Sequence, residues 1–147
     1  MNRSDVTALI LEKKLLHGLS WKDLSARLGV SKEWSTAALL GQMPLSAEQA
    51  RVVTHLLELP EEVERILQEV PSRGCLPTAI PTDPTIYRFY EILQVYGTTI
   101  KELIHEEFGD GIMSAIDFSI DISRVTDEHG DRIKVTMNGK YLKYKTY

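Results

Sequence analysis

The spacing of apolar residues changes once along this chain, and that change limits the possible folds more than any other feature. Before residue 109, apolar side chains recur every three or four positions, which is the period of an amphipathic helix. From Met113 onward they alternate with polar ones, as in a half-buried strand: Ile116, Phe118, Ile120 and Ile122 are separated by Asp117, Ser119 and Asp121. We therefore predict an α+β protein, mainly α, with its strands near the C-terminus.

A proline-rich segment separates two parts of the chain. Residues 71–84, PSRGCLPTAIPTDP, contain four of the six prolines. Because proline fixes φ and has no amide hydrogen to donate, such a segment is typical of an extended connector. We predict two domains, at residues 1–75 and 76–147.

Residues 1–70 contain the start and stop signals of five short helices. Serine is a favoured N-cap, proline is tolerated in the first turn, and glycine commonly ends a helix. The expected helices follow Ser4, Ser20, Ser31, Ser46 and Pro60, and the first three end at Gly18, Gly29 and Gly41. A compact five-helix bundle is the predicted N-terminal domain.

The second and third of these helices have the spacing of a helix-turn-helix motif, with Gly29 in the turn of LSWKDLSARLGVSKEWSTAALLG. A DNA-binding regulator with a C-terminal dimerisation domain is therefore one candidate function. Phosphate contacts dominate DNA affinity, however, and residues 1–70 carry eight basic and ten acidic side chains. We favour a bundle that shares only the geometry of the motif, and we expect no nucleic-acid partner.

The second part of the chain is predicted to contain two helices followed by a small antiparallel sheet. One helix is expected to run from Pro84 to Gly97, and the next, TIKELIHEEF, to end at Gly109. DEHGD signals a turn, RIKVTM alternates again, and Asn138-Gly139 is a tight-turn signal before KYLKYKTY, so we expect two or three strands. Because so few strands are only marginally stable in water, we infer that the sheet pairs with another subunit.

One predicted helix, YRFYEILQVYG, combines two charged residues with an almost entirely apolar surface. Arg88 and Glu91 are three residues apart, on the same face of the helix. A helix that is apolar nearly all round is buried in a core or at an interface, where charges are costly unless they are paired or used. A functional site and a structural ion pair are equally open interpretations of these two residues.

The sequence contains no metal-ligand spacing and no glycine-rich phosphate loop, so we expect no metal and no cofactor. The one cysteine, Cys75, excludes an intrachain disulfide, and we interpret it as a structural or merely reactive thiol.

The N-terminal residues lack an apolar signal core, and no stretch approaches the roughly 20 apolar residues of a membrane span. A cytoplasmic protein without a membrane partner is expected. The four histidines lie far apart in the sequence, and no two of them have the spacing of metal ligands: His17, His55, His105 and His129.

The run PTDPTIYRFYEILQVYGTTIKELIHEEFGDGIMSAIDF resembles the signature of the cyanase (cyanate hydratase) family, and the resemblance continues to NGKYL. The N-terminal part, including TAALLGQ, is similar to the helix-turn-helix-like domain of that family. The resemblance covers essentially the whole chain. It places the catalytic residues of the family at Arg88, Glu91 and Ser114, each of the matching type in matching surroundings.

This resemblance implies a bicarbonate-dependent decomposition of cyanate to ammonia and carbon dioxide through carbamate, with no metal or other cofactor. Arg88 would bind the anionic substrates, Ser114 would donate a hydrogen bond, and Glu91 would orient Arg88 or relay a proton. It also implies a homodecamer of interlocked dimers with sites shared between subunits. Arg88 alone would face two substrate anions and Glu91, and a second copy of Arg88 would improve that charge balance. A non-catalytic anion-binding module is a third candidate.

Overall fold

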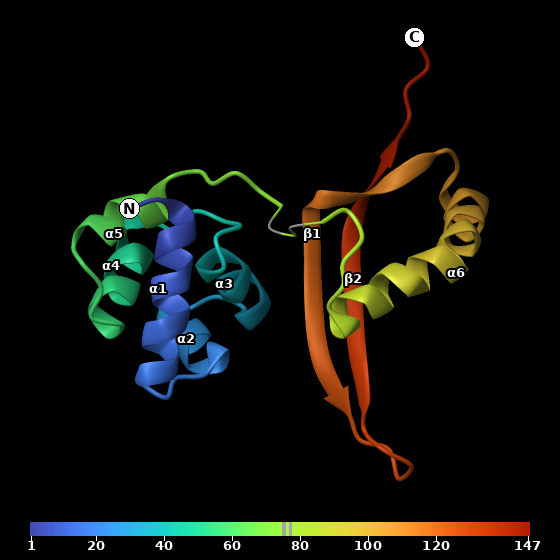
Figure 1. The fold of residues 1–147 in the computed structure, drawn as a ribbon. Helices are drawn as coiled ribbons and strands as arrows, with labels where there is room; N and C mark the ends of the chain where they lie inside the picture. Colours follow the sequence, from blue (N-terminus) through green and yellow to red (C-terminus); the bar gives the residue numbers. More distant parts are fainter. Residues whose placement is uncertain (75, 77) are drawn as a thin grey trace. The chain divides into compact units, whose positions relative to one another are not determined.

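The computed structural model describes every residue of the 147-residue chain except 75 and 77. The chain divides into two compact units, Met1–Cys75 and Leu76–Tyr147 (Figure 1). Cys75, the thiol considered above, lies outside the described residues. Within the described part, no helix combines the length and the apolar character that crossing a membrane requires.

Five short helices form the N-terminal unit, as predicted. The serine N-caps expected for the second, third and fourth helices are confirmed, because each serine side chain accepts a hydrogen bond from the amide three residues on. The first helix is capped by Asn2 and not by Ser4, because Asn2 and Asp5 each bond the backbone amide of the other in a capping box. The helices are α1 (Arg3–Leu16), α2 (Trp21–Leu28), α3 (Lys32–Leu39), α4 (Ala47–Leu56) and α5 (Glu62–Gln68).

This unit has a hydrophobic core of its own. Each of its helices contributes at least one fully or almost fully buried aliphatic side chain, and complete burial of one such side chain contributes about 1.5–3 kcal/mol. The unit therefore buries its apolar surface within a single chain. The core residues are Val6, Ile10, Leu24, Leu28, Ala38, Leu39, Leu45, Ala50, Val53, Leu57, Leu59, Val63, Ile66 and Leu67.

Arg3 ties three segments of this unit together. Its Nη1 donates to the carbonyl of Ile66 at 2.8 Å, and its Nη2 donates to the carbonyls of Ala38 at 3.1 Å and Met43 at 2.8 Å. These acceptors lie in the last turns of α5 and α3 and just beyond α3, where backbone carbonyls lack helical partners. Burial lowers the pKa of Arg3, and the charge of Glu69 offsets part of this effect.

The C-terminal unit consists of one long helix and a two-stranded antiparallel ribbon, so the α+β class predicted from the sequence is confirmed. The side chain of Asp83 caps the helix by accepting hydrogen bonds from the amides of Thr85 and Ile86. Figure 1 shows the helix running beside the ribbon, whose hairpin end extends past it. The elements are α6 (Pro84–Phe108), β1 (Gly111–Val125) and β2 (Arg132–Lys143).

Two predictions for this unit are wrong. The helix does not end at Gly97 but continues to Phe108, because a single glycine costs only about 1 kcal/mol in a helix interior and is offset by the residues on both sides. Asn138 and Gly139 do not form a turn but lie inside β2, paired with Ser119 and Phe118 of β1. The sheet therefore has two strands, the smaller of the two numbers expected from the sequence.

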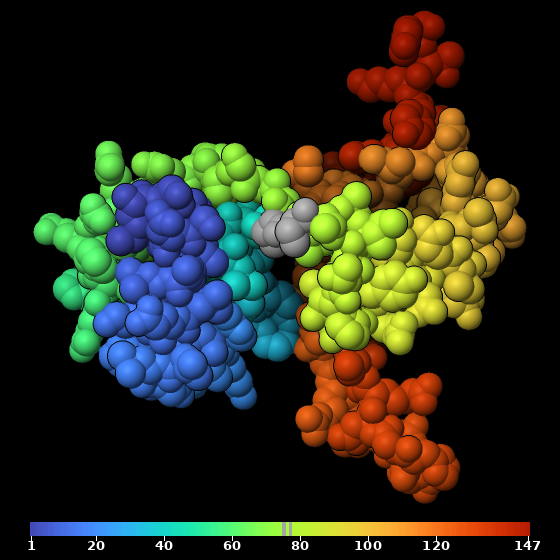
Figure 2. Space-filling model, viewed as in Figure 1, coloured from blue at the N-terminus to red at the C-terminus, as the bar shows by residue number. Residues whose placement is uncertain are grey.

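The C-terminal unit does not bury its apolar side chains. None of the 25 residues of α6 is buried, and the helix exposes Phe89, Leu93 and Val95 by 48%, 59% and 62%. Figure 2 shows the side chains of α6, in yellow to orange, spread over the surface. Among the described residues, every member of the buried hydrophobic core belongs to the N-terminal unit. A single copy of the C-terminal unit therefore has no hydrophobic core.

We expect Arg3→Met to destabilise the N-terminal unit by roughly 2–4 kcal/mol, because hydrogen bonds to a charged group contribute about 1.5–3 kcal/mol each and their acceptors would lose this partner. The measurement is the denaturant midpoint of the full chain, followed by circular dichroism. Arg27→Met is the matched control, because Arg27 is exposed on α2, and it should change stability by less than about 0.5 kcal/mol. Equal effects of the two substitutions would contradict the role assigned to Arg3.

Candidate active site

Arg88 and Glu91 lie near the start of α6 and form an ion pair. The Nη1 atom of Arg88 is 3.1 Å from Oε2 of Glu91, as their spacing along the helix allows. Their side chains are 67% and 51% exposed, so the pair contributes little to stability. Stabilisation of a single chain therefore does not account for this ion pair.

The guanidinium of Arg88 keeps most of its hydrogen-bonding capacity. Of its five N–H groups, only the one directed at Glu91 makes a hydrogen bond with a described residue. Its Cζ atom also lies 6.0 Å from the ring centroid of Tyr87, at the outer limit of a cation–π contact. Glu91 thus holds one side of the guanidinium and leaves the remaining donors available to an anion.

Ser114 lies in an irregular part of the sheet. Met113 pairs with Tyr141 and Phe118 pairs with Gly139, so four residues of β1 stand opposite the single residue Lys140. The extra residues form a β-bulge, a feature that bends a strand and redirects its side chains. Ser114 is the first of the four residues, and it is 4% exposed.

The hydroxyl of Ser114 holds this bulge together. Its Oγ accepts hydrogen bonds from the amides of Ile116 at 3.0 Å and Asp117 at 2.9 Å. A hydroxyl oxygen has two acceptor positions and one proton, so both acceptor positions are occupied. What Ser114 can still offer to a ligand is its O–H as a donor.

The structure brings Arg88 and Glu91 together but does not join either of them to Ser114. Among the described residues, no hydrogen bond or ion pair links the bulge in β1 to the pair on α6. The sequence predicted Arg88, Glu91 and Ser114 as site residues. It contained no signal for the backbone amides of Ile116 and Asp117, which donate hydrogen bonds to Ser114. Asn138-Gly139 is a turn signal in the sequence, whereas in the structure Gly139 pairs with Phe118 at the edge of the bulge.

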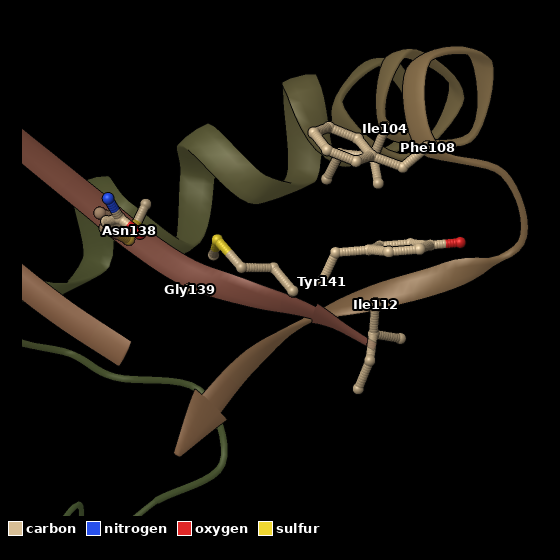
Figure 3. Close-up of a pocket in the computed structure, with 8 residues that line it drawn as sticks. Ile104, Phe108, Ile112, Asn138, Gly139 and Tyr141 are labelled. Atoms are coloured by element: carbon tan, nitrogen blue, oxygen red, sulfur yellow. The ribbon is translucent and has the colours of Figure 1, made fainter. Parts of the chain in front are cut away.

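A separate cavity of 270 Å³ lies between the C-terminal half of α6 and the ribbon (Figure 3). Figure 3 shows Tyr141 between Phe108 and Ile112, with its hydroxyl pointing away from Asn138 and Gly139. Its lining contains no charged side chain, so it is unsuited to small anions. The lining residues are Ile104, Phe108, Ile112, Met113, Met137, Asn138, Gly139 and Tyr141.

The comparisons with known proteins cover the whole chain. A family model described as "Cyanate hydratase, N-terminal" matches residues 3–71, and one described as "Cyanate lyase C-terminal domain" matches residues 78–146. Proteins named cyanate hydratase from Dechloromonas aromatica and Cupriavidus necator are each 60% identical to this chain over the full length of both chains. This chain belongs to the cyanate hydratase family.

A solved member of the family has the same fold. The crystal structure of cyanase from T. urticae matches with a TM-score of 0.81 and 37% identity, covering 94% of this chain and 96% of that one. The helix pair α2–α3 lies within the N-terminal family model, and no comparison favours the DNA-binding alternative. Across the part of the chain that the structure describes, no group of three or more His, Cys, Asp or Glu residues could hold a metal ion.

Proposed function

We propose that this chain catalyses the decomposition of cyanate with bicarbonate, through carbamate, to ammonia and carbon dioxide. The chain belongs to a family of lyases, and the names of the family's members identify cyanate as their substrate. The observation that carries the proposal is the Arg88 guanidinium, which Glu91 holds at 3.1 Å while its other donors remain available. A planar cation of this kind suits small carboxylate-like anions, because it can bind them through two parallel hydrogen bonds.

The reaction consumes one cyanate, one bicarbonate and two protons, and it yields one ammonia and two carbon dioxide molecules. An oxygen of bicarbonate attacks the cyanate carbon and forms a C–O bond. The bicarbonate proton and one further proton are transferred to the cyanate nitrogen. Breaking the bond between that oxygen and the former bicarbonate carbon releases carbon dioxide and leaves carbamate. Carbamate then takes up the second proton and separates into ammonia and carbon dioxide.

The three site residues divide this work. Arg88 binds the two anions and lowers the repulsion between them, and positioning them together removes much of the entropic barrier. Ser114 donates its O–H to an oxygen that gains negative charge, because its acceptor positions are occupied by the amides of Ile116 and Asp117. Glu91 orients Arg88, and its carboxylate is the group next to the site that can relay a proton to nitrogen.

The site requires more than one chain. Within one chain Ser114 has no bond to Arg88 or Glu91, and one arginine faces two anions and a carboxylate. The apolar surface of α6 also lacks a cover in one copy. We therefore propose that copies of the C-terminal unit pack together and build shared sites, in a homodecamer of interlocked dimers as the family resemblance implies. Association of several apolar α6 faces would supply the missing core.

The proposed steps are proton transfers and bond rearrangements, and they need neither a redox group nor a metal. We expect the enzyme to need no cofactor other than its co-substrate bicarbonate. The lone cysteine fits a protein of a reducing compartment, and we place the reaction in the cytoplasm.

The purified full-length protein should release ammonia from cyanate only when bicarbonate is present. Ammonia release is measured after exhaustive dialysis against a chelator, with and without added bicarbonate. Unchanged activity after chelation is expected, because none of the steps needs a Lewis acid. Activity that is lost and then restored by a divalent metal would contradict the cofactor-free mechanism, and no ammonia under any condition would contradict the function itself.

Arg88→Lys should lower kcat/KM for cyanate by about 100-fold or more, because lysine keeps the charge but lacks the planar pair of donors. The assembled particle should keep its size in sedimentation, because lysine keeps a positive charge beside Glu91. Arg27→Lys makes the same chemical change at an exposed position of α2, so its kcat/KM should match that of the unmodified protein. A small effect at Arg88, similar to that at Arg27, would remove Arg88 from the site.

Mixing two inactive variants tests whether sites are shared. Arg88→Leu and Ser114→Ala chains, dissociated together and reassembled, should regain about a quarter of the original activity if each site takes Arg88 from one chain and Ser114 from another. Subunit exchange is verified by mass spectrometry of isotope-labelled chains, and each variant reassembled alone is the control. Complete exchange without any recovery of activity would mean that each site is built from one chain.

A further inference from the structure

Gly139 lies where β2 passes the bulge of β1, and a side chain there has no room. A Cβ atom on Gly139 would lie 2.4 Å from the carbonyl oxygen of Ser114 and 2.5 Å from Cγ of Met113. Side-chain atoms do not approach a backbone oxygen so closely, so either β2 or the Ser114 segment would have to move. The φ angle of Gly139 is not positive, so the reason for glycine at this position is space and not backbone conformation.

A side chain at position 139 would collide with Ser114, the residue whose hydroxyl organises the bulge. Ser114 is buried, and its Oγ is fixed by the amides of Ile116 and Asp117. Displacing the Ser114 carbonyl would rotate its peptide and move the hydroxyl relative to these two amides. The direction of the Ser114 O–H proton thus depends on the close approach of β2 at Gly139.

We propose that Gly139 is a positioning residue that sets the direction of the Ser114 O–H donor. The inference rests on the proposed function, in which Ser114 donates a hydrogen bond to the reacting anions. Gly139 does not touch the substrate in this scheme. It acts because its missing side chain lets β2 pass close to the bulge and keeps the two amide hydrogen bonds to Ser114 in place.

A double-mutant cycle tests this role. Gly139→Ala should lower kcat by at least about tenfold, and Ser114→Ala by about 100-fold or more. If Gly139 acts through Ser114, adding Gly139→Ala to Ser114→Ala should lower kcat no further, because no hydroxyl is left to misplace. Loss of the same factor in both backgrounds would overturn the proposal. Failure of Gly139→Ala to assemble would also overturn it, since the whole sheet would then require the glycine.

Gly111→Ala is the matched control, because it places an equally close contact in the same pair of strands without touching Ser114. A Cβ on Gly111 would lie 2.5 Å from the carbonyl oxygen of Leu142 and 2.5 Å from Cε2 of Tyr141. Gly111→Ala should lower kcat by the same factor in the unmodified protein and in the Ser114→Ala variant. A control that also loses its effect in the Ser114→Ala background would contradict a specific role for Gly139.

Amide hydrogen exchange separates this inference from the proposed function. In the full-length protein, Ser114→Ala and Gly139→Ala should each accelerate exchange at Ile116 and Asp117 by about tenfold or more, because both substitutions disturb the same two hydrogen bonds. This result would support the positioning role even if the protein released no ammonia from cyanate. Unchanged exchange at both amides in Gly139→Ala would overturn the inference whatever the activity.

Discussion

The C-terminal unit cannot bury its apolar surface within one chain. α6 contains no buried residue, although large apolar side chains are exposed along its length. The helix and the two-stranded ribbon each leave an apolar face that must be buried against another element. An isolated ribbon of two strands is only marginally stable in water. The N-terminal unit is different, because its five helices bury a core without help.

The same constraint bears on the proposed chemistry of Arg88 and Glu91. Arg88 and Glu91 are exposed in one copy, where water would screen them and weaken their action on an anion. Association of the α6 faces would remove that water and strengthen every interaction of the guanidinium. In the proposed assembly, the hydrophobic surface that brings the copies together would also create the water-poor environment in which Arg88 acts on small anions.

Local signals in the sequence predicted the N-terminal unit well and the C-terminal unit less well. The serine caps and the period of the apolar residues are properties of neighbouring residues, so the helices of the bundle followed from them. Gly97 and the Asn138-Gly139 pair were misinterpreted because each is a statistical signal of a break or turn. In the structure, helical residues on both sides of Gly97 continue α6, and pairing with β1 keeps Gly139 within β2.

The fold class, the five-helix bundle, the family and the candidate residues Arg88, Glu91 and Ser114 could all be predicted from the linear chain. These depend on residue type and on short-range spacing, which are present in the linear chain. The position of Ser114 in a bulge, with both acceptor positions of its hydroxyl occupied and Gly139 close to its carbonyl, became visible only in the folded chain. The reason is physical: a bulge arises from the register between two strands, and register is set by how whole strands pair.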